Sequence, residues 1–567
     1  MSTSTSESKH GSVNSRLRLS VHDRPKMLEQ LESEVFDLVI IGGGITGAGA
    51  ARDAASRGLR VALIEAKDFA IGTSSRSSKL VHGGIRYLEN YEFHLVFEAL
   101  SERQLLFELA PHLVHPLRFV LPVYEGYRFG MGMMGLGMWA YDALSMFEAP
   151  ELHERLSPSE TRDRLPSLKP EGLKGSYVYS DAYMDDDRLV LETLRSAVAQ
   201  GALAVNRMKA VEAIFNSQGR VEGVVAQDVK TSRRYAIRGR HVVSTVGVWT
   251  DQVATDLLKT WKPILRPSKG VHLTFPRSRF DLQDAVVMSE DKRIVFGIPR
   301  HEMFIVGTTD TDFKGDAYDV SVTPEDVRYL LGVTEEYFPG AKISARDIMA
   351  SYAGVRPLVD DGSATESKTS REHVILADPR GITFIAGGKY TTYRHMAEQT
   401  VDAALGQMQL EDQVKFGRSR TTEALNPLAT VDKLATARAR VDEWAIQFQI
   451  ARHAAETLAD RHALEAEALW DLDPGPAFSA DERLWTMEAL HAIRETMCDS
   501  LVDFYFRRVP LALSRTDHGL PLIGRISRAF QEELNWSDAE RASQTRQLQE
   551  QIQREFAWRS AFSEAST

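Results

Sequence analysis

Residues 36–65 read FDLVIIGGGITGAGAARDAASRGLRVALIE, and this stretch decides the fold class. The apolar run that opens it is rich in β-branched residues, which is typical of a buried parallel strand. Glycines follow directly, and then an alanine-rich helix is predicted, with Gly58 just past its end. A second apolar strand over 59–64 ends on Glu65. The pattern predicts a βαβ unit of the kind that binds dinucleotides.

The small and acidic residues of this unit have distinct predicted roles. Gly42 permits the tight turn, and Gly44 lets the backbone of Ile45-Thr46 approach a pyrophosphate at the helix N-terminus. Gly47 allows the helix to pack closely on the strand, and Glu65 can accept a hydrogen bond from an adenosine ribose hydroxyl. A glycine triplet alone is weak evidence. A strand, glycines, a helix and a carboxylate in register together predict a dinucleotide site.

The bulk composition bounds the class of protein. A chain of 567 residues exceeds one ordinary core, so two or three domains are expected. The net charge of −11 argues against non-specific nucleic-acid binding, and we expect no nucleic-acid partner. Because Cys498 is the single cysteine, neither an intramolecular disulfide nor a cysteine-ligated metal site can form, and we predict no metal centre. The composition suits a reducing compartment.

The order of predicted strands, helices and glycine turns indicates a mixed α/β and α+β architecture. The predicted parts are a disordered extension at 1–34, a discontinuous cofactor domain at 35–110, 175–261 and 346–410, an antiparallel-sheet substrate domain at 111–174 and 262–345, and an all-α C-terminal domain at 425–560. In the last part, apolar residues at steps of three and four from Met487 to Phe504 predict one amphipathic helix. No run approaches the ~18 apolar residues of a membrane-spanning helix.

Residues 130–144 are unusually rich in methionine and glycine and contain one tryptophan and one tyrosine. One interpretation is a surface that enters the lipid interface, where aromatic rings are favoured. The other interpretation, which we prefer, is an adaptable packed helix filled with methionine.

Cationic side chains at glycine-flanked turns predict a phosphate-binding pocket. Arginine binds phosphate through two parallel hydrogen bonds, and lysine acts as a point charge. The predicted set is Arg86, Arg356, Arg371 and Lys389. Each of these alone is consistent with a solvated surface residue, whereas their shared setting beside glycines favours a cleft.

Two further side chains are candidates for acting on a substrate hydroxyl. His272 lies on a predicted strand, and near neutral pH a histidine is suited to remove an alcohol proton. The alternative for His272 is a histidine that is satisfied within the core. Thr309 ends a strand and is placed to orient hydroxyls, although an ordinary turn is equally consistent with its position.

Strands followed by glycines recur in the middle and near the end of the chain, before Gly247, Gly354 and Gly387. This interrupted layout indicates a bound flavin, FAD, rather than an exchangeable nicotinamide. A helix predicted to begin near Thr391 would direct its positive N-terminal end at the reduced flavin.

Blocks of sequence at separate positions form a recognisable set. They are 41–47, 73–75, 78–89, 290–293, 307–310, 354–358 and 387–394, followed by 503–508 near the C-terminus. The block SKLVHGGIRYLE at 78–89 is highly specific. Together the blocks resemble the flavin-dependent glycerol-3-phosphate dehydrogenases of the D-amino-acid-oxidase-like flavoprotein superfamily. The resemblance implies a doubly wound, Rossmann-like FAD domain of the glutathione-reductase and D-amino-acid-oxidase type, interleaved with the substrate domain.

The resemblance also implies an activity and a set of site residues. Bound FAD would oxidise sn-glycerol 3-phosphate to dihydroxyacetone phosphate, with electrons passing to a membrane quinone from a protein attached peripherally to the cytoplasmic face of the membrane. The implied catalytic residues are His272, Arg356, Lys389 and Arg86, and the implied substrate-binding residues are Arg86, Tyr87, Arg356, Arg371, Lys389 and Thr309. The implied FAD contacts are Gly42, Gly44, Ile45, Thr46, Gly47, Glu65, Thr73, Ser74, Ser75, Lys79, Leu80, His82, Gly83, Gly84, Gly247, Trp249, Gly354, Arg356, Gly388, Lys389 and Thr391.

Two alternatives stay open at the level of sequence. The first is an oxidase of the same family, which passes electrons to dioxygen and forms hydrogen peroxide; the lack of a recognisable long insertion in the cofactor domain favours the dehydrogenase. The second is a flavin-binding regulatory protein, against which the intact cationic set argues. The sequence leaves the oligomeric state open, a homodimer included.

Overall fold

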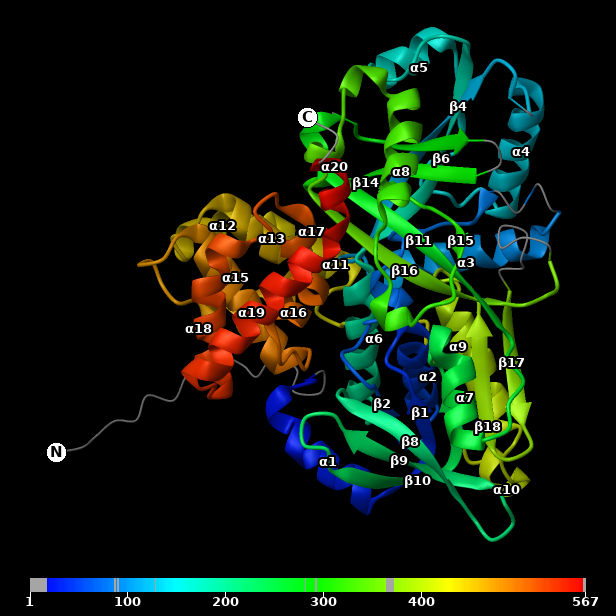
Figure 1. Cartoon of the computed structure of the whole chain (residues 1–567), viewed down its shortest axis with the longest axis vertical. Helices are drawn as coiled ribbons and strands as arrows, with labels where there is room; N and C mark the ends of the chain where they lie inside the picture. Colours follow the sequence, from blue (N-terminus) through cyan, green and yellow to red (C-terminus); the bar gives the residue numbers. More distant parts are fainter. Residues whose placement is uncertain are drawn as a thin grey trace.

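The computed structural model describes residues 18–85, 88, 91–127, 129–280, 282–290, 293–363 and 372–563. Within these ranges the strands form two sheets, and the C-terminal helices form a separate domain beside them (Figure 1). The first sheet occupies the lower half of Figure 1 and the second sheet the upper half. No helix of the described residues is long and apolar enough to cross a membrane.

The first sheet has eight strands among the described residues, and it is built on the motif quoted above. Its strands are β1 (Val35–Ile41), β2 (Val61–Ile64), β7 (Leu203–Val205), β8 (Met208–Phe215), β9 (Val221–Asp228), β10 (Arg234–Ser244), β17 (His373–Asp378) and β18 (Ile382–Gly387). β1 pairs in parallel with β2 on one side and with β10 on the other, and Ile41 faces Ile64 and Ser244 in the register. The carboxyl ends of these strands therefore meet at one edge, where dinucleotides bind in such sheets.

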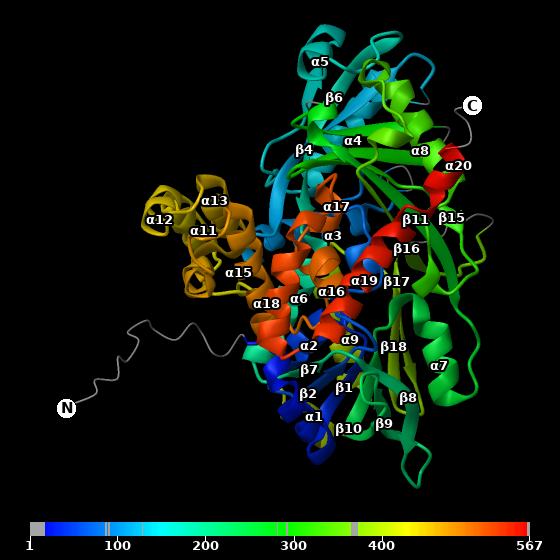
Figure 2. The ribbon, with the colours of Figure 1, turned by 60° about the vertical axis from the view of Figure 1, so that its left-hand side comes forward.

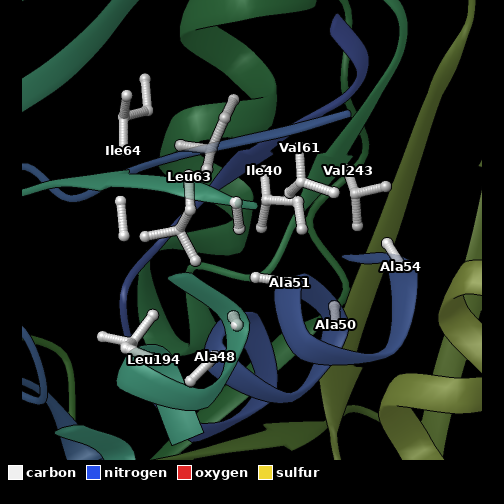
Figure 3. Packing of buried hydrophobic residues seen from close by; sticks show 14 of the residues in the cluster. Ile40, Ala48, Ala50, Ala51, Ala54, Val61, Leu63, Ile64, Leu194 and Val243 are labelled. Atoms are coloured by element: carbon white, nitrogen blue, oxygen red, sulfur yellow. The ribbon is translucent and has the colours of Figure 1, made fainter. Parts of the chain in front are cut away.

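Helix α2 (Ile45–Ser56) packs on this sheet through its alanines. Figure 3 shows Ala48, Ala51 and Ala54 of α2 facing the apolar side chains of β1 and β2, with Leu194 of α6 (Asp186–Ala199) close by. Alanine is short, so the helix axis can approach the strands and neighbouring helices closely. The predicted βαβ unit is confirmed.

The second sheet has ten strands in the described part of the chain. They are β3 (Leu80–Val81), β4 (Val114–Tyr124), β5 (Glu154–Leu156), β6 (Leu173–Met184), β11 (Leu265–Pro276), β12 (Ala285–Glu290), β13 (Arg293–Arg300), β14 (Met303–Gly307), β15 (Thr311–Asp312) and β16 (Ala350–Val359). All pairs in it are antiparallel except β4 with β12. The antiparallel strands predicted over 262–345 all lie in this sheet.

The predicted domain boundaries differ from the structure at three strands. The sequence places β3, β16 and most of β6 in the cofactor domain, whereas the structure pairs them within the second sheet. β6 pairs with β4 over eleven residue pairs, from Val114↔Met184 to Tyr124↔Leu173, and β16 pairs with β11 over ten, from Leu265↔Val359 to Thr274↔Ala350. Long antiparallel pairing thus draws these strands away from the parallel sheet that precedes or follows them in sequence.

Helices cover both sheets. Those of the first two thirds of the chain are α1 (Arg24–Ser33), α2, α3 (Phe93–Leu109), α4 (Met131–Leu144), α5 (Pro158–Arg164), α6, α7 (Thr250–Leu258), α8 (Pro324–Tyr337), α9 (Tyr393–Leu405) and α10 (Leu410–Gln413). The predicted disordered extension at 1–34 differs from the structure for residues 18–34, which contain α1 and a backbone bridge from Leu19 to Thr496. Apolar residues of this segment, including Leu19 and Leu31, are fully buried, which explains its order. Residues 1–17 lie outside the described residues.

The C-terminal domain is helical throughout its described length and forms its own apolar core (Figure 2). Its elements are α11 (Val431–Ala439), α12 (Val441–Gln447), α13 (Arg452–His462), α14 (Ala466–Leu469), α15 (Ala480–Glu495), α16 (Leu501–Asp503), the π-helical turn Phe504–Arg508, α17 (Leu511–Ser514), α18 (Ile523–Leu534), α19 (Asp538–Glu555) and α20 (Ser560–Ser563). The single amphipathic helix predicted from Met487 to Phe504 is wrong, because α15 ends at Glu495 and the chain turns at Met497, where φ is +51°.

Buried ion pairs hold the helical domain against the first sheet. Asp68, three residues after Glu65, accepts hydrogen bonds from Arg507 Nε and Arg508 Nη1, both at 2.8 Å. Burial alone would raise the pKa of Asp68, but the charges of Arg508 and Arg507 outweigh it and hold the pKa below its ordinary value. The loop that carries Glu65 is therefore fixed in part by the C-terminal domain.

A second polar cluster lies at the same interface. Within the described ranges, His462, Glu465 and His491 form the one group of close potential metal ligands, with ligand atoms within 4.8 Å of one another. The Glu465 carboxylate already accepts hydrogen bonds from Arg195 Nη2 at 2.5 Å and from His491 Nε2 at 3.1 Å. His462 Nε2 lies 3.0 Å from a Glu488 oxygen. These contacts make the cluster a polar network between α6 and the helical domain.

Candidate active site

One cavity of about 370 Å³ runs from the glycine motif of the first sheet to the edge of the second sheet. Its walls come from the ends of β1, β2, β10 and β18 on one side and from β11 and β16 on the other. The cavity therefore has two ends, one at the βαβ motif and one between the sheets.

The motif end is closed tightly around its glycines. A Cβ atom placed on Gly47 would lie 2.0 Å from the carbonyl oxygen of Gly42 and 2.6 Å from Thr245 Oγ1. Real Cβ atoms do not approach so closely, so only glycine lets α2 start against β1 and β10. Gly44 is the N-cap residue of α2 and lines the cavity. As a glycine, it has no side chain that could cap the helix. This end is suited to a pyrophosphate, because helix N-termini attract anions.

Glu65 lies at the C-terminal end of β2 and lines this end of the cavity. Its two carboxylate oxygens accept hydrogen bonds from the backbone N–H groups of Gly43 and Lys67, each at 2.8 Å. Burial raises the pKa of Glu65, although these two N–H groups oppose the change. The carboxylate is thus fixed in position and keeps further lone pairs for a ribose hydroxyl.

Arg356 lies on β16 at the other end of the cavity. Its Nη2 donates to Thr308 Oγ1 at 2.8 Å and to the Thr309 carbonyl at 3.2 Å, and its Nη1 lies 3.3 Å from Asp310 Oδ1. Gly270 on the adjacent strand makes room for the guanidinium, since a Cβ atom there would lie 2.4 Å from Arg356 Nη2. These contacts fix the guanidinium at the cavity wall, where its positive charge can attract an anion.

His272 lies on β11 beside Arg356 and also lines the cavity. Its ring stacks on Tyr352 with centroids 4.8 Å apart, and its Nε2 lies 2.8 Å from Ser78 Oγ. Burial, and then the charges of Arg356 and Lys79, lower the pKa of His272 well below its ordinary value. The imidazole is therefore neutral near pH 7, which is the form that can accept a proton, and its lowered pKa makes it a weaker base than an ordinary histidine.

The turn after β18 completes this end of the cavity. Gly388, Lys389, Tyr390 and Thr391 line it just before α9. Thr391 Oγ1 accepts a hydrogen bond from the His82 N–H at 3.2 Å, and Tyr390 donates to the Asp186 carbonyl at 2.5 Å. Residues 309 and 204 positions apart in the sequence are thereby held at one site.

Most of the predicted contacts come together in this cavity. Those that line it are Gly42, Gly44, Ile45, Thr46, Glu65, Thr73, Ser74, Leu80, His82, Gly247, Trp249, His272, Gly354, Arg356, Gly388, Lys389 and Thr391. Gly47, Ser75, Lys79, Gly83, Gly84 and Thr309 lie outside its lining. Arg86, Tyr87 and Arg371 lie outside the described residues.

Two of the residues outside the lining have clear structural roles. Lys79 is fully buried, and its Nζ donates to Asp186 at 2.5 Å and to the Ser75 carbonyl at 3.3 Å. These two contacts use the Lys79 ammonium to stabilise the loop that carries Thr73 and Ser74, so Lys79 shapes the cavity indirectly. The Thr309 hydroxyl accepts a hydrogen bond from the Val271 N–H at 3.0 Å, and the Thr309 carbonyl accepts one from Arg356 Nη2.

The cavity also contains residues that sequence reasoning missed. Ser78 and Tyr390 lie within the specific blocks, so their positions could have suggested a role. Lys209 and Tyr318 line the motif end without any local signal in the sequence. Only the tertiary fold brings these last two to the site.

Comparison with known proteins now places the chain in a family. Residues 37–394 match a model described as FAD dependent oxidoreductase, and residues 432–541 match the C-terminal domain of alpha-glycerophosphate oxidase. The aerobic glycerol-3-phosphate dehydrogenase of Bacillus subtilis (strain 168) is 37% identical, with 86% of this chain and 89% of that protein covered. The chain belongs to the FAD-dependent glycerol-3-phosphate dehydrogenase family.

Other relatives of the family extend this comparison along the whole chain. The aerobic glycerol-3-phosphate dehydrogenase of Staphylococcus saprophyticus is 33% identical, with 94% of this chain and 97% of that protein covered. The structure of the glycerol-3-phosphate dehydrogenase from Bacillus halodurans complexed with FAD has a TM-score of 0.78 at 29% identity, covering 94% and 97% of the two chains. L-alpha-glycerophosphate oxidase from Mycoplasma pneumoniae, at 17% identity and a TM-score of 0.52 over 65% of this chain and 95% of its own, shares the fold.

The residues of the cavity fit FAD, the cofactor of this family. Gly42 and Gly44 line the cavity at the N-terminus of α2, where a pyrophosphate is expected. Trp249 Nε1 is buried and has no hydrogen-bond partner among the described residues, although its ring lines the cavity. A buried donor of this kind fits a ligand that supplies an acceptor.

Proposed function

We propose that the protein oxidises sn-glycerol 3-phosphate to dihydroxyacetone phosphate and passes the electrons to a membrane quinone. The observation that carries the proposal is that Arg356, Lys389 and the neutral His272 all line the reacting end of the FAD cavity. Cations suit a phosphate monoester, and a neutral imidazole suits the removal of a hydroxyl proton. The family membership supports the same substrate.

The residues around FAD divide the work of the reaction. Gly44, Glu65 and the turn at Gly388 would hold the cofactor, which supplies a hydride acceptor when it is bound. Arg356 would bind the substrate phosphate through its fork of donors, with Lys389 adding a second positive charge. His272 Nε2 would take the proton of the secondary hydroxyl, since no other described histidine except His82 lines the cavity.

The N-terminal end of α9 supports the same assignment. The helix begins at Tyr393, directly after the cavity-lining Thr391. A helix N-terminus carries about half a positive charge. That charge would stabilise the negative charge that develops during hydride uptake.

The activity is tested most directly by anaerobic reduction. Addition of glycerol 3-phosphate to the purified yellow protein should bleach the flavin absorbance without oxygen, and a quinone analogue should restore it. Absence of bleaching would contradict the proposed substrate. Stoichiometric hydrogen peroxide in air, with no preference for the quinone analogue, would instead identify the oxidase of this family.

An exposed apolar face supports contact with the membrane. On α4, the side chains of Met133, Leu136 and Trp139 are 60%, 66% and 59% exposed, while Met138 and Tyr141 on the other side are buried. Phe93 and Phe97 of the adjacent α3 are also exposed. Exposed apolar side chains on two neighbouring helices, aromatic rings among them, suit the membrane interface. The preferred interpretation of 130–144 as packed therefore describes only one side of α4.

We expect this face to hold the protein peripherally on the inner surface of the cytoplasmic membrane, close to the quinone. The double variant L136E/W139E should lose binding to anionic lipid vesicles while its activity with a water-soluble acceptor stays at the wild-type level. A matched control is V431E/I446E, which adds the same two charges at exposed apolar residues of the helical domain. Vesicle binding by L136E/W139E equal to wild type would remove α4 from the membrane contact. Sedimentation of the same samples distinguishes a monomer from a homodimer.

A further inference from the structure

Tyr318 reaches the FAD cavity from the substrate domain. It lies in the short turn Ala317–Asp319 between β15 and α8, and its side chain lines the cavity together with Glu65 and Trp249. These neighbours mark the motif end, where Glu65 takes the ribose, so Tyr318 lies at the adenosine end of the cavity. The turn is fixed locally, because Asp316 accepts a hydrogen bond from the Tyr318 N–H at 2.9 Å.

The Tyr318 ring is held between two residues of the cofactor domain. It stacks on Trp249 with centroids 4.3 Å apart and an interplanar angle of 27°. Lys67 Nζ lies 3.8 Å from the centre of the Tyr318 ring, and it must lie over the opposite face because Trp249 covers the first. Stacking and cation–π attraction both stabilise such an arrangement. Trp249 in turn packs against the loop at Gly72, where a Cβ atom would lie 3.0 Å from the indole.

This stack is a partition between two cavities. A second cavity of about 150 Å³ adjoins the first and is lined by Lys67 and by Arg554 of α19. Trp249 and Tyr318 belong to the walls of both cavities, together with Ile71, Gly72, Thr73, Arg76, Val248 and Gly354. Arg554 Nη2 also lies 2.9 Å from Asp319 Oδ1, so the helical domain contacts the same turn. If the Tyr318 ring were absent, the adenosine end would open into the second cavity and admit water.

The charge of the Glu65 carboxylate, which is predicted to bind the ribose, also acts on the Tyr318 phenol. Burial, and then the charges of Glu65 and Asp316, raise the pKa of Tyr318 above its ordinary value. The phenol is therefore protonated at all working pH values. It can donate its proton to an acceptor at the motif end, as the buried indole of Trp249 can.

We propose that Tyr318 is a cofactor-binding residue: stacked on Trp249 and backed by Lys67, its ring closes the adenosine end of the cavity, so that the substrate domain helps to retain FAD. This inference concerns cofactor retention and does not depend on which substrate is oxidised. Because Tyr318 belongs to the substrate domain, the rate of FAD release would report how tightly that domain packs against the cofactor domain.

The test measures FAD release from the holoenzyme. Dilution of the yellow protein, with the rise of flavin fluorescence as readout, gives the release rate, and free FAD in ultrafiltrates gives the dissociation constant. Y318L should raise both about tenfold, because it removes the ring and opens the partition. Y318F should stay within twofold, because the ring and the stack remain. W249L should match Y318L, and the double variant should add little, because each change breaks the same stack.

A matched control separates this role from a general loss of stability. F448L removes an equally close stack in the helical domain, where Phe448 and Trp470 have centroids 4.4 Å apart, and it should leave FAD release unchanged. If Y318L yields no folded protein, K67M replaces it, because this change keeps the ring and removes only the ammonium above it; release two- to threefold faster is then expected. FAD release within twofold of wild type in Y318L, or within error of wild type in K67M, would overturn the proposal, as would an equal loss of FAD from F448L.

Discussion

The two ends of the FAD cavity are built in opposite ways. The adenosine end comes mainly from thirty consecutive residues, 36–65, in which a strand, a glycine turn, a helix and a second strand form a local unit. The reacting end is assembled from Ser78, His272, Arg356 and Lys389, which belong to different strands and turns of both sheets. A locally built site is encoded by spacing, whereas an assembled site depends on the pairing of distant strands. Changes at the two ends should therefore fail in different ways.

The largest effect is expected at the adenosine end. G47A places a Cβ atom 2.0 Å from the Gly42 carbonyl, so α2 must move away from β1. We expect a loss of about 3 kcal/mol of stability, at the upper end for overpacking, and purification without FAD. Flavin absorbance per protein and thermal melting check this. The control G332A lies in α8 with open space around its Cβ position and should keep FAD and melt no lower. Full flavin content in G47A would show that the close packing of α2 at Gly47 is not needed for FAD binding.

At the reacting end, R356K should reduce catalysis without releasing FAD. Lysine keeps the charge but cannot reproduce the fork that Arg356 presents beside Thr308. We expect kcat/KM for glycerol 3-phosphate to fall about 100-fold, which corresponds to about 2.7 kcal/mol, with KM raised and kcat lowered.

The control for R356K lies on the neighbouring strand. Arg266 pairs with Asp312 outside the cavity lining, and R266K should retain wild-type kinetics. Steady-state kinetics together with flavin content decide the outcome. Unchanged kcat/KM in R356K would remove Arg356 from the substrate pocket.

A milder change at the adenosine end should weaken FAD binding alone. E65Q keeps the size of the side chain but loses one of the two oxygens that accept the Gly43 and Lys67 N–H groups. We expect the FAD dissociation constant to rise about tenfold, or about 1.4 kcal/mol. Turnover at saturating FAD should stay at the wild-type value, since the reacting end is untouched. A fall in kcat under saturating FAD would show that the two ends are coupled.

The smallest expected effect is a dependence of stability on pH, to which one buried histidine of each sheet contributes. His241 in the first sheet has its pKa lowered to about 4 by burial and then by Arg220, and burial also lowers the pKa of His272 in the second sheet. The unfolded chain binds protons at these histidines below about pH 6.5, whereas the folded protein does not, so stability falls as pH falls through that value. At pH 5.5 each histidine should cost on the order of 1 kcal/mol.

Thermal melting of the holoenzyme at pH 7.5 and 5.5 checks this prediction. H241Q removes one titrating group, and the loss of melting temperature between the two pH values should be smaller in this variant than in the wild type. An equal loss of melting temperature in H241Q and in the wild type would show that His241 does not contribute to the pH dependence.

Sequence reasoning succeeded where the signal is periodic or local. The alternating roles of Gly42, Gly44 and Glu65 follow from one βαβ pattern, and the structure places all three on the cavity. It failed where distant contacts override local patterns. The apolar spacing from Met487 to Phe504 predicts one helix, yet α15 stops at Glu495 because the next turns bring Arg507 and Arg508 onto Asp68.

By itself the sequence determined the dinucleotide motif and the FAD cofactor, because glycine spacing and residue chemistry are visible along the chain. The cationic set stays a prediction for Arg86 and Arg371, which lie outside the described residues. The tertiary structure decided which cations and hydroxyls meet. In the structure Lys79 pairs with Asp186 instead of lining the cavity, and the turn between β15 and α8 brings Tyr318 to the adenosine end. The reason is physical: a local turn needs only neighbouring residues, whereas a shared cavity needs two sheets and a helical domain to pack against one another. The motif at 36–65 holds the cofactor, and the packing of the rest of the chain around it places the side chains that are to act on the substrate.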